Sequence, residues 1–278
     1  VIQSINLALV TLLLKKFTRW YMFFTALYVA LNFFIAENNL WYEQTITTGY
    51  LLILLFMPRR KILIGIIAGL LSLIKPIAAI VLLPVLVFSY SFSTLVGFTL
   101  IWLLAIVFYT MQSGLTQFYN GIISYNAFLL ENYQGHPIGH EKLLLFAAFL
   151  ILLTFPVIFK RTGLLLITML LSTFVFLRLT FGKDHLTPTA TLFVLLLGWG
   201  SAQMKGLYKW IFLGSVVVLM IFLIRQIKHF LPSLIAHRVN EQRQEQEIAG
   251  VIPDYESLYV FGDRPTLYVT LGKLPPTY

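Results

Sequence analysis

Charged residues are sparse in this sequence, and the densest group of them has the residue types of a functional site. Arg178, Lys183, Asp184 and His185 stand at the end of one apolar run and the start of the next. A charge in or beside a hydrocarbon layer costs about 2.5–3.5 kcal/mol, so such residues tend to face a cavity, a partner or a lipid headgroup. The group therefore predicts a site. The alternative is a hydrated loop, with Arg178 snorkelling to the membrane interface.

Two further charges, Glu43 and Lys75, each stand at the border of apolar runs. Lys75 precedes Pro76 inside the long apolar stretch 62–92. As one helix this stretch would measure about 45 Å, longer than the ~30 Å hydrocarbon core of a bilayer. Proline also disfavours helix at the residue before it. We therefore predict a hairpin of two short helices with Lys75 at its turn, on the outer membrane edge. The alternatives are a lysine held by lipid headgroups alone and, for Glu43, a solvated loop acid.

The composition excludes a soluble globular protein. The 278 residues are 59% hydrophobic and 11% charged, with a mean hydropathy of +0.85, whereas soluble domains carry about 25% charged residues. There is no cysteine, which excludes disulfides and thiolate metal sites. Residues 1–228 hold 16 Lys and Arg against five Asp and Glu, so the net charge of +9 belongs to the apolar part and does not indicate nucleic acid. The sequence predicts an all-α polytopic membrane protein.

About ten membrane segments are expected, some of them short or broken. The apolar runs are 1–14, 18–36, 46–57, 62–74, 77–92, 95–110, 143–159, 162–180, 187–203 and 207–227. With ten segments the basic clusters between runs all lie on one side, the cytoplasmic one. All five acids before residue 229 then lie on the other side. We expect a multi-pass protein of the plasma (inner) membrane with its C-terminus outside.

Three outer stretches are expected, the first of them the short stretch 36–46 that holds Glu43. The stretch 112–142 has apolar residues at helical spacing, which predicts a helix on the membrane surface. His136 and His140 follow it, but Pro137 and Gly139 argue against a helical metal pair, so no metal site is predicted. We divide the chain into a transmembrane domain, 1–230, and a small extracytoplasmic α/β appendage, 231–278. The appendage is expected to have a surface helix over 233–248 and a strand over 257–261.

Three stretches resemble, in order, the GT-C superfamily of polyprenyl-phosphate-dependent membrane glycosyltransferases. They are similar to the bacterial relatives of protein O-mannosyltransferases and lipid A aminoarabinose transferase, of the glycosyltransferase family 39 type. Residues 65–84 (GIIAGLLSLIKPIAAIVLLP) resemble a glycine-rich helix, a Lys-Pro turn and a Leu-Pro exit. Residues 181–188 resemble the segment in which a histidine opens a membrane span. Residues 259–278 are similar to the terminal pattern of these enzymes.

The resemblance implies transfer of a hexosyl or pentosyl group, with inversion, from a polyprenyl-phosphate donor. The acceptor would be a lipid, glycan or protein on the extracytoplasmic side. Such an enzyme needs a carboxylate to take the acceptor proton and cations to hold the lipid phosphate. The catalytic candidates are Glu43, His185 and Asp184, the last of which either orients His185 or pairs with Lys183. The candidates for phosphate binding are Lys75, Arg178 and Lys183, because arginine gives a bidentate contact and lysine a point charge.

The chain departs from the family in two places. The family's first outer loop carries the acid expected to act as base, and this chain begins after it, so we expect a front-truncated chain that is inactive alone. Leu186 follows His185, where the family often has tyrosine. No cofactor is predicted, and the part of a divalent cation is left open. Two other classes compete, a transporter or lipid flippase, suited to broken helices and outer cations, and a non-catalytic assembly subunit.

Overall fold

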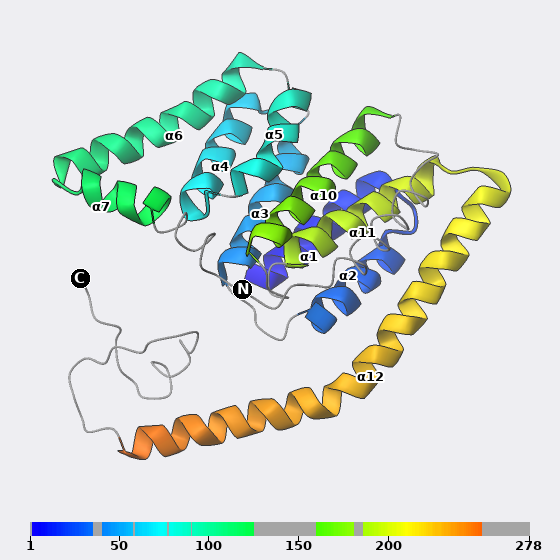
Figure 1. Cartoon of the computed structure of the whole chain (residues 1–278). Helices are drawn as coiled ribbons and strands as arrows, with labels where there is room; N and C mark the ends of the chain where they lie inside the picture. The colour runs from blue at the N-terminus through cyan, green and yellow to red at the C-terminus, as the bar shows by residue number, and fades with distance from the viewer. Residues whose placement is uncertain are drawn as a thin grey trace. The chain divides into compact units, whose positions relative to one another are not determined.

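The computed structural model describes residues 2–35, 41–57, 59–76, 78–89, 91–124, 160–180 and 186–251 (Figure 1). The described chain is mostly helical (91%), and no strand occurs in it. The all-α prediction is confirmed to that extent. The chain divides into two units, 1–223 and 224–278. The predicted strand over 257–261 lies outside the described residues.

Nine of the ten predicted apolar runs coincide with one helix each, and the tenth, 143–159, lies outside the described residues. A short helix and a π-helical turn follow α6, within the stretch where a surface helix is predicted. The elements are α1 (Ile2–Phe17), α2 (Tyr21–Ile35), α3 (Trp41–Phe56), α4 (Lys61–Ile74), α5 (Ala78–Ser89), α6 (Phe92–Met111), α7 (Leu115–Tyr119), η1 (Asn120–Ser124), α10 (Arg161–Thr180), α11 (Leu186–Gln203) and α12 (Gly206–Val251).

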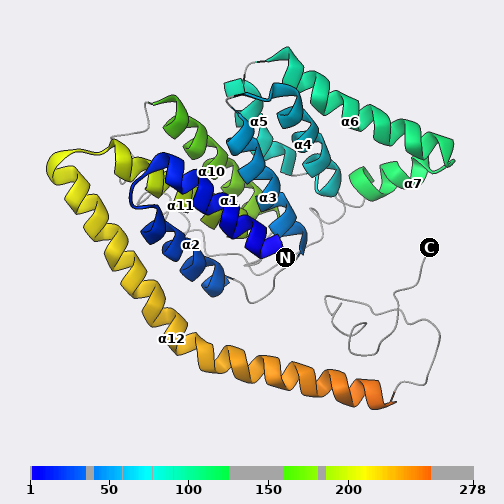
Figure 2. The same cartoon turned by 180° about the vertical axis from the view of Figure 1, so that it is seen from behind.

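The predicted hairpin at Lys75 is confirmed. Helix α4 ends at Ile74, Lys75 is extended (φ −151°, ψ 104°), and α5 begins at Ala78. The Lys75 N–H donates to the Leu71 carbonyl and closes the last turn of α4. Because α5 returns the chain, α4 and α6 run in the same direction and pack side by side (Figures 1 and 2).

Glycines make the close contact between α4 and α6. A Cβ on Gly65 would lie 2.0 Å from the Thr94 carbonyl oxygen, and one on Gly97 would lie 2.3 Å from the Ile62 carbonyl oxygen. A Cβ on Gly69, one turn beyond Gly65, would lie 2.8 Å from the Ile101 side chain. Small residues four apart that let two backbones approach are the usual contact between membrane helices.

Helix α11 forms the centre of the first unit. Every residue from Thr187 to Ser201 is buried, because α1, α2, α3 and α10 all pack against it. A helix that is buried all round belongs to the core of a large protein or to a membrane bundle. Its neighbours contribute fully buried side chains such as Leu14, Phe24 and Leu166.

Three contacts join helix ends that carry basic residues at one end of this unit. We call it the basic end. Thr18 and Ser201 share a hydrogen bond of 3.0 Å, Lys160 donates to the Gln203 side chain, and Arg161 donates to the Phe88 carbonyl at 2.7 Å. The exposed cations at the basic end are Lys15, Lys16, Arg19, Arg59, Arg60, Lys160, Arg161 and Lys205. In the described part of residues 1–223, the one acid, Glu43, lies at the opposite end.

Two helix boundaries differ from the prediction. Helix α3 begins at Trp41, so Glu43 lies in its first turn and not in a loop. Helix α12 runs from Gly206 to Val251 with Pro232 inside it, whereas the sequence analysis ended the membrane run at 227 and began a separate helix at 233. The change from apolar to polar residues along α12 therefore does not coincide with a break in its backbone.

Two of the described helices are long and apolar enough, by length and composition, to cross a membrane. They are Phe92–Met111 and Gly206–Arg225. Three shorter apolar helices are Tyr21–Asn32, Lys61–Ile74 and Arg161–Thr173. In α6 only Thr94 and Gly97 are buried, and many of its large apolar side chains are exposed, such as Leu95, Leu103 and Leu104.

Candidate functional site

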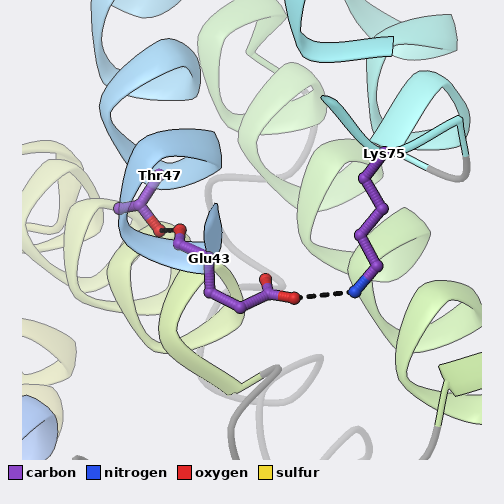
Figure 3. A network of polar contacts seen from close by, with 3 residues as sticks. All are labelled: Glu43, Thr47 and Lys75. Carbon is purple, nitrogen blue, oxygen red and sulfur yellow. Dashed lines mark hydrogen bonds and ion pairs between the residues drawn. The ribbon is translucent and has the colours of Figure 1, made fainter. Parts of the chain in front are cut away.

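Glu43 and Lys75, which the sequence analysis selected separately, form an ion pair. The Lys75 Nζ lies 2.8 Å from the Glu43 Oε1. Figure 3 shows the two side chains pointing toward one another, Glu43 from the first turn of α3 and Lys75 from the turn between α4 and α5. The contact joins residues 32 positions apart in the sequence. It is the centre of the candidate site.

The backbone around each partner explains why the charges stand there. Glu43 is in the first turn of α3, where unpaired N–H groups and the helix dipole favour a negative charge. The Thr47 hydroxyl donates to the Glu43 carbonyl at 2.8 Å (Figure 3). Lys75 follows the last residue of α4, where the dipole favours a positive charge.

The pair is largely withdrawn from water. The Glu43 side chain is 1% exposed and the Lys75 side chain 16% exposed. A buried carboxylate is expensive unless it is paired, and Lys75 provides a counter-charge. Burial lowers the pKa of the Lys75 ammonium, and the neighbouring Glu43 carboxylate opposes this shift without cancelling it.

A polar network from α1 holds the first turns of α3. The Asn6 amide nitrogen donates to the Gln44 carbonyl at 3.0 Å and to the Gln44 side-chain oxygen at 2.9 Å. The Thr48 hydroxyl lies 2.7 Å from the Asn6 side-chain oxygen. Asn6 and Gln44 are both buried. Gln44 is the neighbour of Glu43 in the chain, so the network fixes the backbone that carries the carboxylate.

Two aromatic residues hold the Lys75 side of the pair. The Tyr50 hydroxyl, on α3, donates to the Ala78 carbonyl at 3.3 Å, at the start of α5. The Trp102 Nε1–H, on α6, donates to the Ser72 hydroxyl at 2.9 Å, in the last turn of α4. The turn that carries Lys75 is therefore anchored on both flanks.

Comparison with protein-family models, curated proteins and solved structures gave no match. The resemblance to GT-C glycosyltransferases therefore stays a prediction.

The structure brings together two of the six predicted site residues. Arg178 lies in the last turn of α10, but the position of its side chain is outside what the structure describes. Lys183, Asp184 and His185 lie outside the described residues. His136 and His140 lie outside them as well. Among the described residues, no group of three or more His, Cys, Asp or Glu is placed to hold a metal.

The residues that position the pair were not among those predicted from the sequence. They are Asn6, Thr48, Tyr50 and Trp102. The available signal was Asn6, a carboxamide within an apolar run, because polar groups inside membrane segments face partners. Gln44 and Thr48, four positions apart, also lie on one face of a helix. The sequence does not reveal that the face of α1 with Asn6 meets the face of α3 with Gln44 and Thr48.

Chemically, the pair combines a carboxylate, which can accept a proton or bind a cation, with an ammonium, which donates hydrogen bonds to anions. An ammonium carries three N–H donors, so a lysine can contact an oxyanion as well as a carboxylate. The carboxylate can take a proton from a hydroxyl or amine that comes within hydrogen-bond distance. Such a site suits a reaction in which an anionic group leaves near a nucleophile.

Proposed function

We propose that this chain is part of a multi-pass membrane glycosyltransferase that takes its sugar from a polyprenyl-phosphate donor. The observation that carries the proposal is the buried Glu43–Lys75 pair at the end of the bundle opposite the basic end. A buried ion pair is weak evidence for stability, because desolvation offsets the attraction. Placement of such a pair at one end of an apolar bundle is better explained by binding of a charged group.

The distribution of polar and apolar residues supports a membrane location. Polar side chains such as Asn6, Gln44 and Thr47 are buried, while large apolar ones such as Phe92 and Trp210 are more than 60% exposed. Soluble proteins rarely expose extended apolar surfaces. In a bilayer the same pattern is favourable, because lipid covers the apolar surface and helices satisfy each other's polar groups. The basic end would then face the cytoplasm, and the pair the outer side.

In this proposal Lys75 binds the phosphate of the lipid donor. Glu43 is then the carboxylate on the acceptor side, or a ligand for a cation. Arg178 and Lys183 would add contacts to the same phosphate, and Asp184 with His185 would complete the site. A hydrogen bond to a charged group contributes about 1.5–3 kcal/mol. Loss of Lys75 should therefore weaken phosphate binding by about 10- to 150-fold.

The test compares two lipids in nanodiscs of zwitterionic phospholipid. Undecaprenyl phosphate should bind more tightly than undecaprenol, which has the same chain and no phosphate. Lys75→Gln should abolish this preference, and Lys205→Gln, a matched change at the basic end, should keep it. Equal binding of the two lipids by the unchanged protein would refute the proposal. Transfer from a panel of polyprenyl-phosphate sugars to endogenous membrane acceptors is the second step.

The alternative is a lipid flippase or transporter. It is favoured by α4 and α5, whose 14 and 12 residues give about 21 and 18 Å, short of a ~30 Å core. Discontinuous helices of this kind occur around transport sites. Movement of undecaprenyl phosphate between leaflets of protein-containing vesicles, without sugar transfer, would favour this class over the enzyme.

A further inference from the structure

Asn6 has an unusual environment for a carboxamide. Its side chain is fully buried, and both of its polar atoms are used. The amide nitrogen donates to Gln44 twice, at 3.0 and 2.9 Å, and the oxygen lies 2.7 Å from the Thr48 hydroxyl. The three contacts all join α1 to the first two turns of α3. No carbonyl of α1 takes part, so the link depends on the Asn6 side chain.

Stability alone gives a weak reason for this link. A hydrogen bond contributes about 1 kcal/mol net, and replacing both partners with apolar groups of the same shape can be nearly neutral. Elsewhere α1 packs through apolar side chains such as Leu13 and Leu14, with a single long hydrogen bond of 3.4 Å from Thr25 on α2 to Thr11. What a three-bond contact adds is direction, because it fixes both the rotation of α3 and its height relative to α1.

The fixed part of α3 is the part that carries Glu43. Asn6 contacts the carbonyl and the side chain of residue 44, and Thr48 is one helical turn further along. A rotation of this turn would swing the Glu43 carboxylate away from Lys75, whose turn is held by Trp102 on α6 and by Tyr50 two turns further along α3. The 2.8 Å contact therefore requires that α3 be held from the α1 side.

We infer that Asn6 is a positioning residue that, with Thr48, sets the geometry of the Glu43–Lys75 pair. Its effect on the pair does not depend on what the site binds. Its effect on ligand binding rests on the proposed function. The two are therefore measured separately.

The first measurement is a zero-length cross-link in the full chain. Dicyclohexylcarbodiimide enters apolar surroundings and activates the Glu43 carboxylate, and the Lys75 amine then displaces the urea to form an amide. Peptide mass spectrometry gives the yield of the 43–75 cross-link. Because the bond forms only between groups in contact, its yield reports the geometry of the pair.

Four variants separate positioning from general destabilisation. Thr48→Val keeps the shape of the side chain but removes the hydroxyl, and Thr48→Ser keeps the hydroxyl. Asn6→Leu removes the whole link. Thr18→Val removes the buried Thr18–Ser201 bond at the other end of α1 and is the matched control. Thermal unfolding of each purified protein shows whether it is folded.

We expect the cross-link yield to fall several-fold in Asn6→Leu and Thr48→Val. Thr48→Ser and Thr18→Val should stay near the unchanged protein. Unchanged yield in folded Asn6→Leu and Thr48→Val would overturn the inference, and so would an equal loss in Thr18→Val. If Asn6→Leu does not fold, Thr48→Val against Thr48→Ser decides.

The second measurement is the preference for undecaprenyl phosphate over undecaprenol. It should change in Asn6→Leu or Thr48→Val, and not in Thr18→Val. Absence of any preference in the unchanged protein, with a cross-link that still responds to Thr48→Val, would refute the proposed function and keep the positioning role. If the unchanged protein prefers undecaprenyl phosphate but the yield of the 43–75 cross-link does not respond to Thr48→Val, the positioning role alone is refuted.

Discussion

The Lys75 ammonium is subject to two opposing effects. Burial disfavours its charged form, and the Glu43 carboxylate 2.8 Å away favours it. Burial has the larger effect, so the pKa of Lys75 lies below that of an ordinary lysine. The amine is therefore neutral over a range of pH in which exposed lysines are still charged. The proposed binding of phosphate by Lys75 should therefore depend on pH.

We predict that the affinity for undecaprenyl phosphate falls as pH rises toward the ordinary lysine pKa of about 10.4. The lowered pKa places the loss of positive charge below that value, and a neutral amine attracts phosphate weakly. Lys75→Arg should remove the fall, because guanidinium stays charged throughout this range. Affinity is measured in nanodiscs across the pH series. A parallel fall in Lys75→Arg would assign the titration to another group.

At this scale the sequence identified the charges but not their contact. Glu43 and Lys75 stood out because an apolar chain has few charges and each must be explained. Their pairing depends on the packing of α3 against α4. A single sequence carries no signal for that packing. Asn6 was visible as a polar residue in an apolar run. Its partners were not, because the parallel arrangement of α1 and α3 is set by α2 between them.

Among the elements, the α4–α6 pair makes the sharpest demand on side-chain size. Gly65 lies where any Cβ would collide with the Thr94 backbone, and a backbone atom moves only if its helix moves. The spacing of Gly65 and Gly69 was visible in the sequence, but Gly97 as the partner was not. The hairpin turn was predictable because one helix over 62–92 would be longer than a hydrocarbon core and because Pro76 disfavours helix at Lys75.

We predict that Gly65→Ala destabilises the protein by about 1–3 kcal/mol, the usual cost of overpacking, or more. Gly214→Ala is the matched control, because that glycine is also helical and a Cβ there meets nothing within 4 Å. It should be neutral or stabilising by up to about 1 kcal/mol, since alanine is the better helix former. Unfolding in detergent measures both. Equal stability of the two variants would contradict the close α4–α6 contact.

Helix boundaries were predicted less well than the helices. The start of α3 is earlier than the apolar pattern suggests, because Trp41–Glu43 are helical although Glu43 is charged. Hydrophobicity locates the part of a helix that is covered by lipid or core, and a helix continues as long as its backbone bonds are satisfied. Helix α12 likewise continues beyond residue 227, although Pro232 has no N–H to donate and removes one bond from its ladder.

For the whole first unit, the contacts determine which helix ends lie together. Arg161, at the start of α10, contacts Phe88, near the end of α5, and α6 starts shortly after α5. The end of α6 is about 30 Å away along its 20 residues. The chain therefore returns to the basic end between Met111 and Lys160. A membrane segment at 143–159 would provide this return, which makes three crossings between α7 and α12.

Three crossings place α7 and the start of α12 on opposite sides of the membrane, and we predict that cysteine labelling will show this. The chain has no cysteine, so single replacements report one position each. Gln117→Cys, on exposed α7, should react with an impermeant maleimide on intact cells. Leu207→Cys should react only after permeabilisation. Leu207 is chosen because it is 74% exposed. Its neighbour Gly206 has a positive φ, at which a cysteine would be strained. Labelling of both from outside would leave an even number of crossings between them. The basic end would then not be cytoplasmic throughout, and the proposal that the Glu43–Lys75 pair faces the outer side would lose its basis.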